Sequence, residues 1–159
     1  MARIMAVCIS SKRGIRKRSV PSGTLLVDYG LEGDAHAGTP RRQVSLLASE
    51  SIAVMKAKGA DVEDGSFGEN LVTEGIVLPT LPIGTRLRIG PDALVEVTQI
   101  GKECHDHCEI YKQVGDCIMP REGIFVRILK GGTVQPGGKI EKVTIADNGT
   151  ESGSGGRDS

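Results

Sequence analysis

Short apolar runs separated by Gly, Pro and Asp recur along most of the chain. Each run has the length of a β-strand, and many are rich in Val, Ile or Leu, which is typical of strands in a closely curled sheet. The predicted strands are residues 4–9, 24–29, 43–47, 70–73, 86–89, 94–100 and 123–129. Twenty-two glycines supply turns between them. The pattern therefore predicts a mainly β fold.

One segment predicts a helix. Ser49 could cap its N-terminus, and Gly59 follows two lysines near its end. The apolar side of this helix would be formed by Ile52, Val54 and Met55. A second, short helix is indicated more weakly over residues 109–114. Many strands with one clear helix and small peripheral helices indicate a β-barrel.

The length of 159 residues suits one domain with a continuous core. Beyond Val143 the sequence consists largely of Gly, Ser, Asn and charged residues. Such a segment buries too little apolar surface to offset the entropy of an ordered chain. We therefore expect residues 1–143 to form the domain and residues 144–159 to be a disordered polar tail.

The overall charge is balanced, with 20 basic and 20 acidic residues, and aromatic residues make up only 3% of the chain. Neither a net positive charge nor an aromatic platform is present to bind nucleic acid. A basic cluster over residues 12–18 better suits a small phosphorylated ligand. No run approaches the ~20 apolar residues of a membrane span, and no export signal is evident. We expect a cytoplasmic protein with reduced thiols.

The first candidate segment, residues 30–38, combines three glycines with Asp34 and His36, and Arg41 and Arg42 follow it closely. One interpretation is a glycine-shaped turn in which Asp34 accepts hydrogen bonds from backbone N–H groups. The other is an anion-facing loop, in which Arg41 or Arg42 binds a phosphate and His36 lies near a reacting group. The residue types alone leave both interpretations open.

The second candidate segment places Glu69 and Asn70 just before a predicted strand, after a phenylalanine flanked by two glycines. Without other information, Asn70 is best interpreted as a turn residue. Its side-chain amide carries both donors and an acceptor, so it could also bind the edge of a pterin-like ring. Glu69 and Asn70 are therefore candidate ligand contacts.

The third segment is the densest in reactive groups: Cys104, His105, His107 and Cys108 lie within five residues, and Cys117 follows. In one interpretation the two nearby cysteines, with a histidine or Cys117, hold a structural zinc ion. In the other, one thiolate is a nucleophile or a soft metal ligand whose pKa is lowered by neighbouring imidazoles. Zinc fingers normally supply a second well-spaced ligand pair, which is lacking here, so we favour the reactive thiol.

The fourth cysteine lies in a different setting. Cys8 falls within the apolar run of residues 5–9. A thiol in such a run acts as a small buried hydrophobe. We therefore expect Cys108, and not Cys8, to carry function.

Taken together, these segments resemble the MOSC family, which is named for the C-terminal domain of molybdenum cofactor sulfurases. The resemblance extends over nearly all of residues 1–143, and the order and spacing of its pieces carry it. These pieces are residues 7–10 with Gly14 and Lys17, residues 31–38 with 42–47, residues 67–71, 81–85 and 94–101, the Cys108 segment, and residues 123–129.

This resemblance implies a MOSC-type β-barrel and a cysteine that carries persulfide sulfur or ligates molybdenum. Cys108 matches that cysteine by its position after the strand of residues 94–100. Many family members have a single cysteine here, so Cys104 and Cys117 are secondary candidates, together with His105 and His107 as metal ligands.

The implied ligand is the molybdenum cofactor, whose pterin ends in a phosphate. Lys17, Arg41 and Arg42 would supply counter-charges to that phosphate. Asp34 and His36 would transfer a proton or shape their loop. Pyridoxal phosphate is expected only on a separate partner, because the chain is too short to contain a desulfurase domain.

Three functions follow. The protein could bind the molybdenum cofactor, in cofactor biosynthesis or in a small reductase of N-hydroxylated compounds. It could instead relay persulfide from a cysteine desulfurase, as a sulfurtransferase. It could also be a zinc-stabilised binding module without enzymatic activity. We expect the loop of Asp34 and His36, Arg41 or Arg42, Asn70 and Cys108 to line one pocket.

Overall fold

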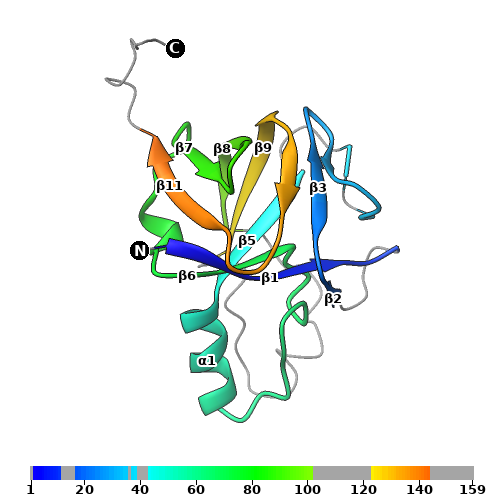
Figure 1. Cartoon of the computed structure of the whole chain (residues 1–159). Coiled ribbons are helices and arrows are strands. Elements are labelled where there is room, and N and C mark those ends of the chain that lie inside the picture. Colours follow the sequence, from blue (N-terminus) through cyan, green and yellow to red (C-terminus); the bar gives the residue numbers. More distant parts are fainter. Residues whose placement is uncertain (1, 12–16, 36, 39–42, 102–122, 144–159) are drawn as a thin grey trace.

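The structure is a computed structural model in which residues 2–11, 17–35, 37–38, 43–101 and 123–143 are described. Figure 1 shows a barrel of strands with the helix α1 at one end. The strands are β1 (Ala2–Ile9), β2 (Arg18–Val20), β3 (Gly23–Leu26), β4 (Gly30–Leu31), β5 (Val44–Ala48), β6 (Leu71–Glu74), β7 (Arg86–Ile89), β8 (Ala93–Ile100), β9 (Ile124–Lys130), β10 (Gly132–Val134) and β11 (Lys139–Val143). The helices are α1 (Ser49–Ala57) and the short 3-10 helix η1 (Leu78–Thr80).

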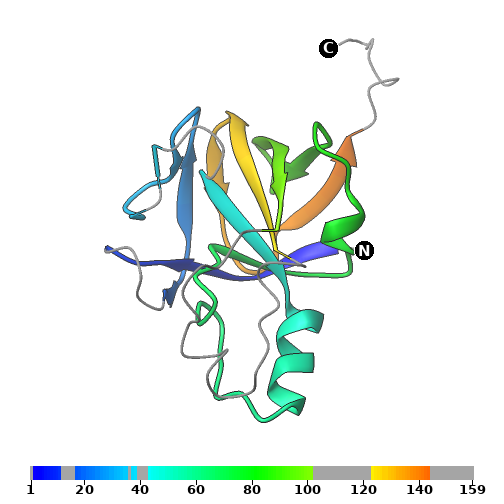
Figure 2. The ribbon, with the colours of Figure 1, turned by 180° about the vertical axis from the view of Figure 1, so that it is seen from behind.

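Within the described residues, seven strands close the barrel, and this confirms the predicted fold class. Their order is β1-β11-β7-β8-β9-β5-β6, with β6 returning to β1. The pair β5–β6 is parallel, and the other pairs are antiparallel. Strand β5 continues directly into α1, and the chain then returns from α1 to form β6 (Figure 2). Strand β2 pairs with β1 at the edge of this sheet, and β10, β3 and β4 form a second, small sheet in that order.

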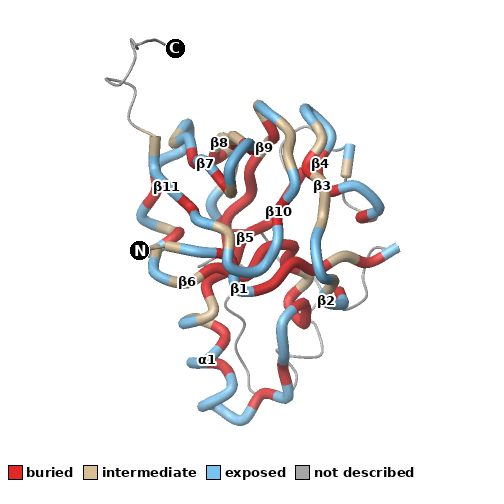
Figure 3. The backbone as a smooth tube through the Cα atoms, in the orientation of Figure 1, coloured by how far each residue is buried: buried red, intermediate tan, exposed pale blue. Residues whose placement is uncertain are grey.

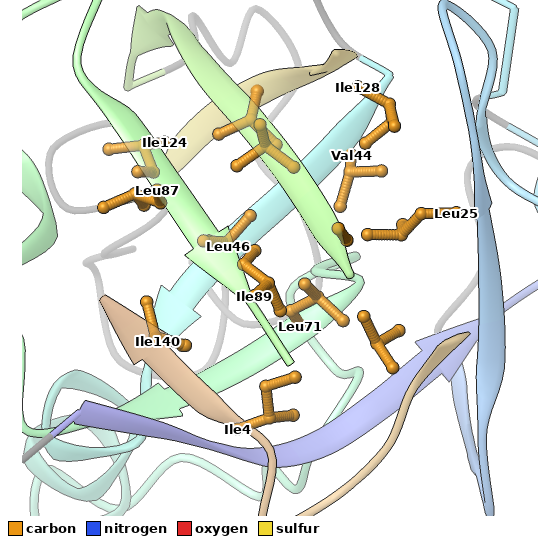
Figure 4. Packing of buried hydrophobic residues seen from close by; sticks show 14 of the residues in the cluster. Ile4, Leu25, Val44, Leu46, Leu71, Leu87, Ile89, Ile124, Ile128 and Ile140 are labelled. Atoms are coloured by element: carbon orange, nitrogen blue, oxygen red, sulfur yellow. The ribbon is translucent and has the colours of Figure 1, made fainter. Parts of the chain in front are cut away.

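Side chains on alternate faces of the strands form two apolar clusters. The larger fills the barrel with aliphatic residues, among them Ile4, Leu46, Leu71, Leu87 and Ile124 (Figure 4). The smaller lies between the outer face of the barrel, α1 and the segment after it, and contains Cys8, Leu47, Met55, Phe67 and Val72. Because β5 contributes to both clusters, all five of its residues are buried (Figure 3).

Each predicted strand corresponds to an observed one: β7 matches its prediction at both ends, and the others differ by one to three residues at one or both ends. The largest shift is in β3, which ends at Leu26 because the chain turns at Asp28, a residue with φ of 52°. The prediction missed β2, β4, β10 and β11. The first three have two or three residues each, which is too short for alternation to be visible.

The helix was predicted at the right place, but two of its details were wrong. Ala48 occupies the N-cap position, and no side chain caps the helix; the Ser49 hydroxyl lies 3.4 Å from the Glu50 carboxylate instead. Val54 is 52% exposed, so the buried side consists of Ile52 and Met55, which are three residues apart. The weaker helix of residues 109–114 and the tail of residues 144–159 lie outside the described residues.

No helix among the described residues is long and apolar enough to span a membrane.

Candidate functional site

A buried ion pair lies beyond the C-terminal end of β1. The Lys17 ammonium group is 2.7 Å from Oδ1 of Asp34, and their side chains are 1% and 0% exposed. Lys17 also donates to the hydroxyl of Ser10 at 3.3 Å. Asp34 accepts a second hydrogen bond, from the backbone N–H of Ser10 at 3.1 Å. The carboxylate thus has a cation and a backbone donor at the same oxygen, which stabilises its charged form.

The loop that carries Asp34 is attached by two hydrogen bonds to Ser10, the residue that follows β1. Besides the bond from Ser10 to the carboxylate, the N–H of Ala35 donates to the Ser10 carbonyl at 2.8 Å. Within the loop, Ala37 N–H donates to the Asp34 carbonyl at 3.2 Å. Gly38 N–H donates back to the carbonyl of Tyr29 at 2.6 Å. Asp34 therefore shapes its loop by accepting a backbone hydrogen bond, one of the two interpretations that the sequence left open.

Glu69 is fully buried, and its carboxylate closes a short turn. Oε2 accepts from Gly65 N–H at 2.8 Å, and Oε1 accepts from Phe67 N–H at 3.0 Å. Burial raises the pKa of Glu69 from 4.5 to about 7, although its backbone donors lower it. The nearby Asp64 carboxylate adds to the increase. Glu69 is thus a buried acid that changes charge near neutral pH.

Asn70 links β1, β5 and β6 at the start of β6. Its side-chain oxygen accepts from the N–H of Ser45 at 3.0 Å, and its amide donates to the carbonyl of Cys8 at 3.1 Å. The Ser45 hydroxyl lies 3.3 Å from the same side-chain oxygen. Asn70 is 1% exposed. Its amide therefore faces backbone groups inside the fold.

Four sequence-predicted residues, Lys17, Asp34, Glu69 and Asn70, belong to one connected hydrogen-bond network. The link between its halves is Gly65, whose carbonyl accepts from Lys17 N–H at 2.9 Å while its own N–H donates to Glu69. Gly65 has φ of 93°, and an added Cβ would collide with the Lys17 carbonyl. A glycine is therefore required where these two segments meet.

The other candidates lie outside the described residues, so their shared pocket stays a prediction. They are His36, Arg41, Arg42, Cys104, His105, His107, Cys108 and Cys117. The two ends of the cysteine-bearing segment are nevertheless described: Gly101 N–H donates to the Gly123 carbonyl at 2.6 Å, and Ile100 pairs with Ile124. In the described part of the chain, no group of three or more His, Cys, Asp or Glu residues could hold a metal ion.

Sequence reasoning assigned no role to several polar residues that build this region. Ser10 and Ser45 bridge the network, and Gln43 accepts from the N–H of Ile128 at 2.9 Å. Ser45 stands between apolar residues in a predicted strand, and a polar residue in such a place signals a buried hydrogen bond. That signal could have identified Ser45. For Ser10 and Gln43 the partners are distant in sequence, and no local pattern indicates them.

The prediction for Cys8 is confirmed as far as its burial is concerned. Its side chain is 0% exposed and lies in the cluster beneath α1. Burial, followed by the charges of Glu69 and Asp64, raises the pKa of Cys8 to about 12. The thiol is therefore protonated at neutral pH and is a poor nucleophile or metal ligand.

A barrel closed by seven strands, with a polar network where its loops meet, defines a small β-barrel protein with candidate ligand-binding loops. The model of the MOSC domain family matches residues 33–141, more than half of the chain. The protein belongs to the MOSC domain family.

One curated relative and several solved structures are similar to this chain. The YflK protein of Bacillus subtilis (strain 168) is 26% identical, and the match covers 86% of this chain and 66% of YflK. The YuaD protein of Bacillus subtilis superposes with a TM-score of 0.70 at 19% identity, covering 88% of this chain and 94% of YuaD. YiiM of Geobacillus stearothermophilus superposes with a TM-score of 0.69 at 21% identity, covering 91% of this chain and 76% of YiiM. At such identities the structural likenesses show the fold alone.

Proposed function

We propose that this protein handles the molybdenum cofactor, either by binding the pterin-bound molybdenum or by carrying its sulfur, through Cys108. The observation that carries the proposal is the MOSC family match over residues 33–141, since the family is associated with molybdenum-cofactor-related proteins. The matched range contains the Asp34 loop, both arginines and the cysteine-bearing segment.

The donor chemistry of the chain fits this cofactor. Molybdenum favours soft thiolate ligands, and Cys108 is the thiol that the family resemblance selects. Cys8 is unsuited to that role because it is buried and protonated. Lys17 is neutralised by Asp34 inside the fold, so the charge opposite the cofactor's phosphate falls to Arg41 and Arg42.

The described residues would support the site rather than react in it. Asn70 and Glu69 bond to backbone groups and thereby set the start of β6 and the turn before it. His36 is then the residue of its loop that would hold a proton for the ligand, because the Asp34 carboxylate already faces a cation and a backbone N–H. When bound, the cofactor would supply the metal and its redox chemistry.

The sulfur-carrying form of the proposal requires a partner, a pyridoxal-phosphate-dependent cysteine desulfurase. The Cys108 thiolate would attack the outer sulfur of the partner's persulfide. A new S–S bond forms on Cys108, the partner's S–S bond breaks, and the partner's thiolate leaves. The transfer involves no net oxidation or reduction.

The test is metal, pterin and sulfane-sulfur analysis of the protein purified from a host that makes the cofactor. Molybdenum with pterin supports the binding form, and labile sulfane sulfur supports the carrying form. Whichever the wild type carries, molybdenum with pterin or sulfane sulfur, we expect Cys108→Ser to lose it. Cys8→Ala is the matched control and should keep it. One zinc ion per chain, or full retention of cargo by Cys108→Ser, would contradict the proposal. Loss in Cys104→Ser alone would move the assignment to that thiol.

A further inference from the structure

The outer face of strands β7, β8 and β9 carries a row of three charged side chains. Arg86 lies opposite Glu96 in the register of β7 with β8, and Glu96 lies opposite Arg127 in the register of β8 with β9. The residues that alternate with these three along their strands belong to the core of the barrel, so the row is on its outside. Figure 1 shows β7 and β8 well away from α1.

Glu96 contacts both arginines of this row. Its Oε1 accepts a hydrogen bond from Nε of Arg127 at 3.0 Å, and its Oε2 lies 3.9 Å from Nε of Arg86. The Glu96 side chain is 20% exposed, whereas those of Arg86 and Arg127 are 43% and 42% exposed. Both guanidinium groups thus meet the carboxylate through Nε, and their terminal Nη groups donate to no described residue. These Nη groups are donors suited to a further anion.

A second row on the same face adds positive charge. Its members, in register two residues along β7 from the first row, are Glu141 of β11, Arg88 of β7, Leu94 of β8 and Lys130 of β9. Arg88 and Lys130 are exposed, and neither forms an ion pair within the described part of the chain. The two rows hold four cationic and two acidic side chains, a net charge of +2 in a chain whose overall charge is zero.

The shape of this face favours a protein partner. From the spacing of strands and residues in a sheet, the four cations are spread over roughly 10 Å across the strands and about 7 Å along them. The outside of a barrel is convex, whereas sites for small molecules are concave. One small anion cannot contact all four cations, but carboxylates spread over a protein surface can. The two rows contain no aromatic side chain on which a nucleic-acid base could stack.

We propose that the outer face of β7, β8 and β9 is a docking surface for an acidic patch of a partner protein. Arg86 and Arg127 bind carboxylates of the partner, and Arg88 and Lys130 add attraction at longer range. Glu96 is a positioning residue: by holding both guanidinium groups in place it lowers the entropy lost on binding. This inference goes beyond the proposed function and does not depend on the identity of the cargo.

The test measures binding of a fluorescently labelled peptide of about ten glutamates to the full chain by anisotropy, at low and at physiological ionic strength. Arg86→Gln/Arg127→Gln removes both cations of the first row. Arg18→Gln/Lys56→Gln removes two exposed cations from β2 and α1 and is the matched control, because it changes the net charge by the same amount. Cooperative urea unfolding checks that each variant is folded.

We expect Arg86→Gln/Arg127→Gln to weaken peptide binding by about five- to tenfold at low salt, as for the loss of two exposed ion pairs. The control should differ from wild type by less than about twofold. Arg88→Gln/Lys130→Gln should weaken binding by a smaller factor, because no carboxylate holds these two cations in place. Wild-type affinity should fall steeply as salt is added, since exposed charges are screened.

Several results would overturn the proposal. Absence of peptide binding at low salt, or equal weakening by the control, would show that the face has no special role. An oligonucleotide of the same length that binds more tightly through the same arginines would make it a nucleic-acid surface. Displacement of the peptide by inorganic phosphate, but not by chloride of equal ionic strength, would make it a small-anion site. Self-association at low salt that Arg86→Gln/Arg127→Gln abolishes would make the occupant a second copy. Should that variant not fold, Arg88→Gln/Lys130→Gln serves the same comparisons.

Discussion

The buried carboxylate of Glu69 makes the stability of this protein depend on pH in a defined direction. Burial raises its pKa from 4.5 to about 7. The folded state thus binds a proton that the unfolded chain has already released at intermediate pH. The contribution of Glu69 to the unfolding free energy is fully present below the pKa of the group in the unfolded chain, and it is lost as pH rises through the pKa in the folded state.

The magnitude follows from the two pKa values. The difference between them corresponds to about 3 kcal/mol in total. Integrated from about pH 5 to about pH 8, the loss of unfolding free energy from this group is about 2–3 kcal/mol. The group is fully buried, so solvent screening does not diminish the effect.

The perturbation that tests this is Glu69→Gln. The amide cannot titrate, so the share of the pH dependence that belongs to Glu69 should disappear. One backbone donor, Gly65 or Phe67, would then face the amide NH₂ group instead of an oxygen. We expect the variant to be less stable than wild type by about 1–3 kcal/mol near the acid end, and the difference to shrink or reverse as pH rises.

The assay is urea unfolding at several pH values between about 5 and 8, with stability extrapolated to water. Glu63→Gln, which changes an exposed carboxylate of the same segment, is the matched control and should keep the wild-type slope. Parallel stability curves for wild type and Glu69→Gln would refute the reasoning. The proton would then be bound equally by the folded and unfolded chains.

Three further predictions concern packing. Cys8→Ser should lower the unfolding free energy by about 1–3 kcal/mol, because it buries a hydroxyl. In the wild type, mass mapping should show that iodoacetamide does not label Cys8 at neutral pH, because the pKa of this thiol is about 12. In urea unfolding, Gly65→Ala should be clearly more destabilising than Gly59→Ala. Both glycines have a positive φ, but only a Cβ at residue 65 would collide with the Lys17 carbonyl. Equal losses of unfolding free energy in the two variants would contradict this collision. Thr73→Val should raise the melting temperature and the unfolding free energy, the latter by about 1 kcal/mol, because the hydroxyl that it removes is buried without a partner among the described residues. A lower unfolding free energy would show that this hydroxyl is hydrogen-bonded.

The apolar pattern of the chain determined the class of fold. Runs of Val, Ile and Leu with turn residues between them were enough to place seven of the eleven described strands, because burial on one or both faces of a sheet leaves a pattern in the local sequence. The helix was visible for the same reason, although Ser49 does not cap it and Val54 is exposed. These two details depend on how α1 packs against the barrel, which local sequence does not specify.

For the candidate site, the sequence identified several of the residues but not the residues that they contact. Sequence reasoning singled out Asp34, Glu69 and Asn70 because they lie in glycine-containing segments, and Lys17 because it belongs to a basic cluster. Their partners came only from the tertiary structure, since barrel closure brings residues together across separations of 17 for Lys17 with Asp34 and 62 for Asn70 with Cys8.

The sequence by itself determined a small MOSC-type barrel and a buried Cys8, and it singled out a set of candidate site residues. Only the tertiary structure decided how the described members of that set are used. A cation in a basic cluster is equally compatible with a surface phosphate contact and with a buried ion pair, because composition does not encode the direction of a side chain. The fold turned Lys17 inward to Asp34, where the two charges neutralise each other away from water.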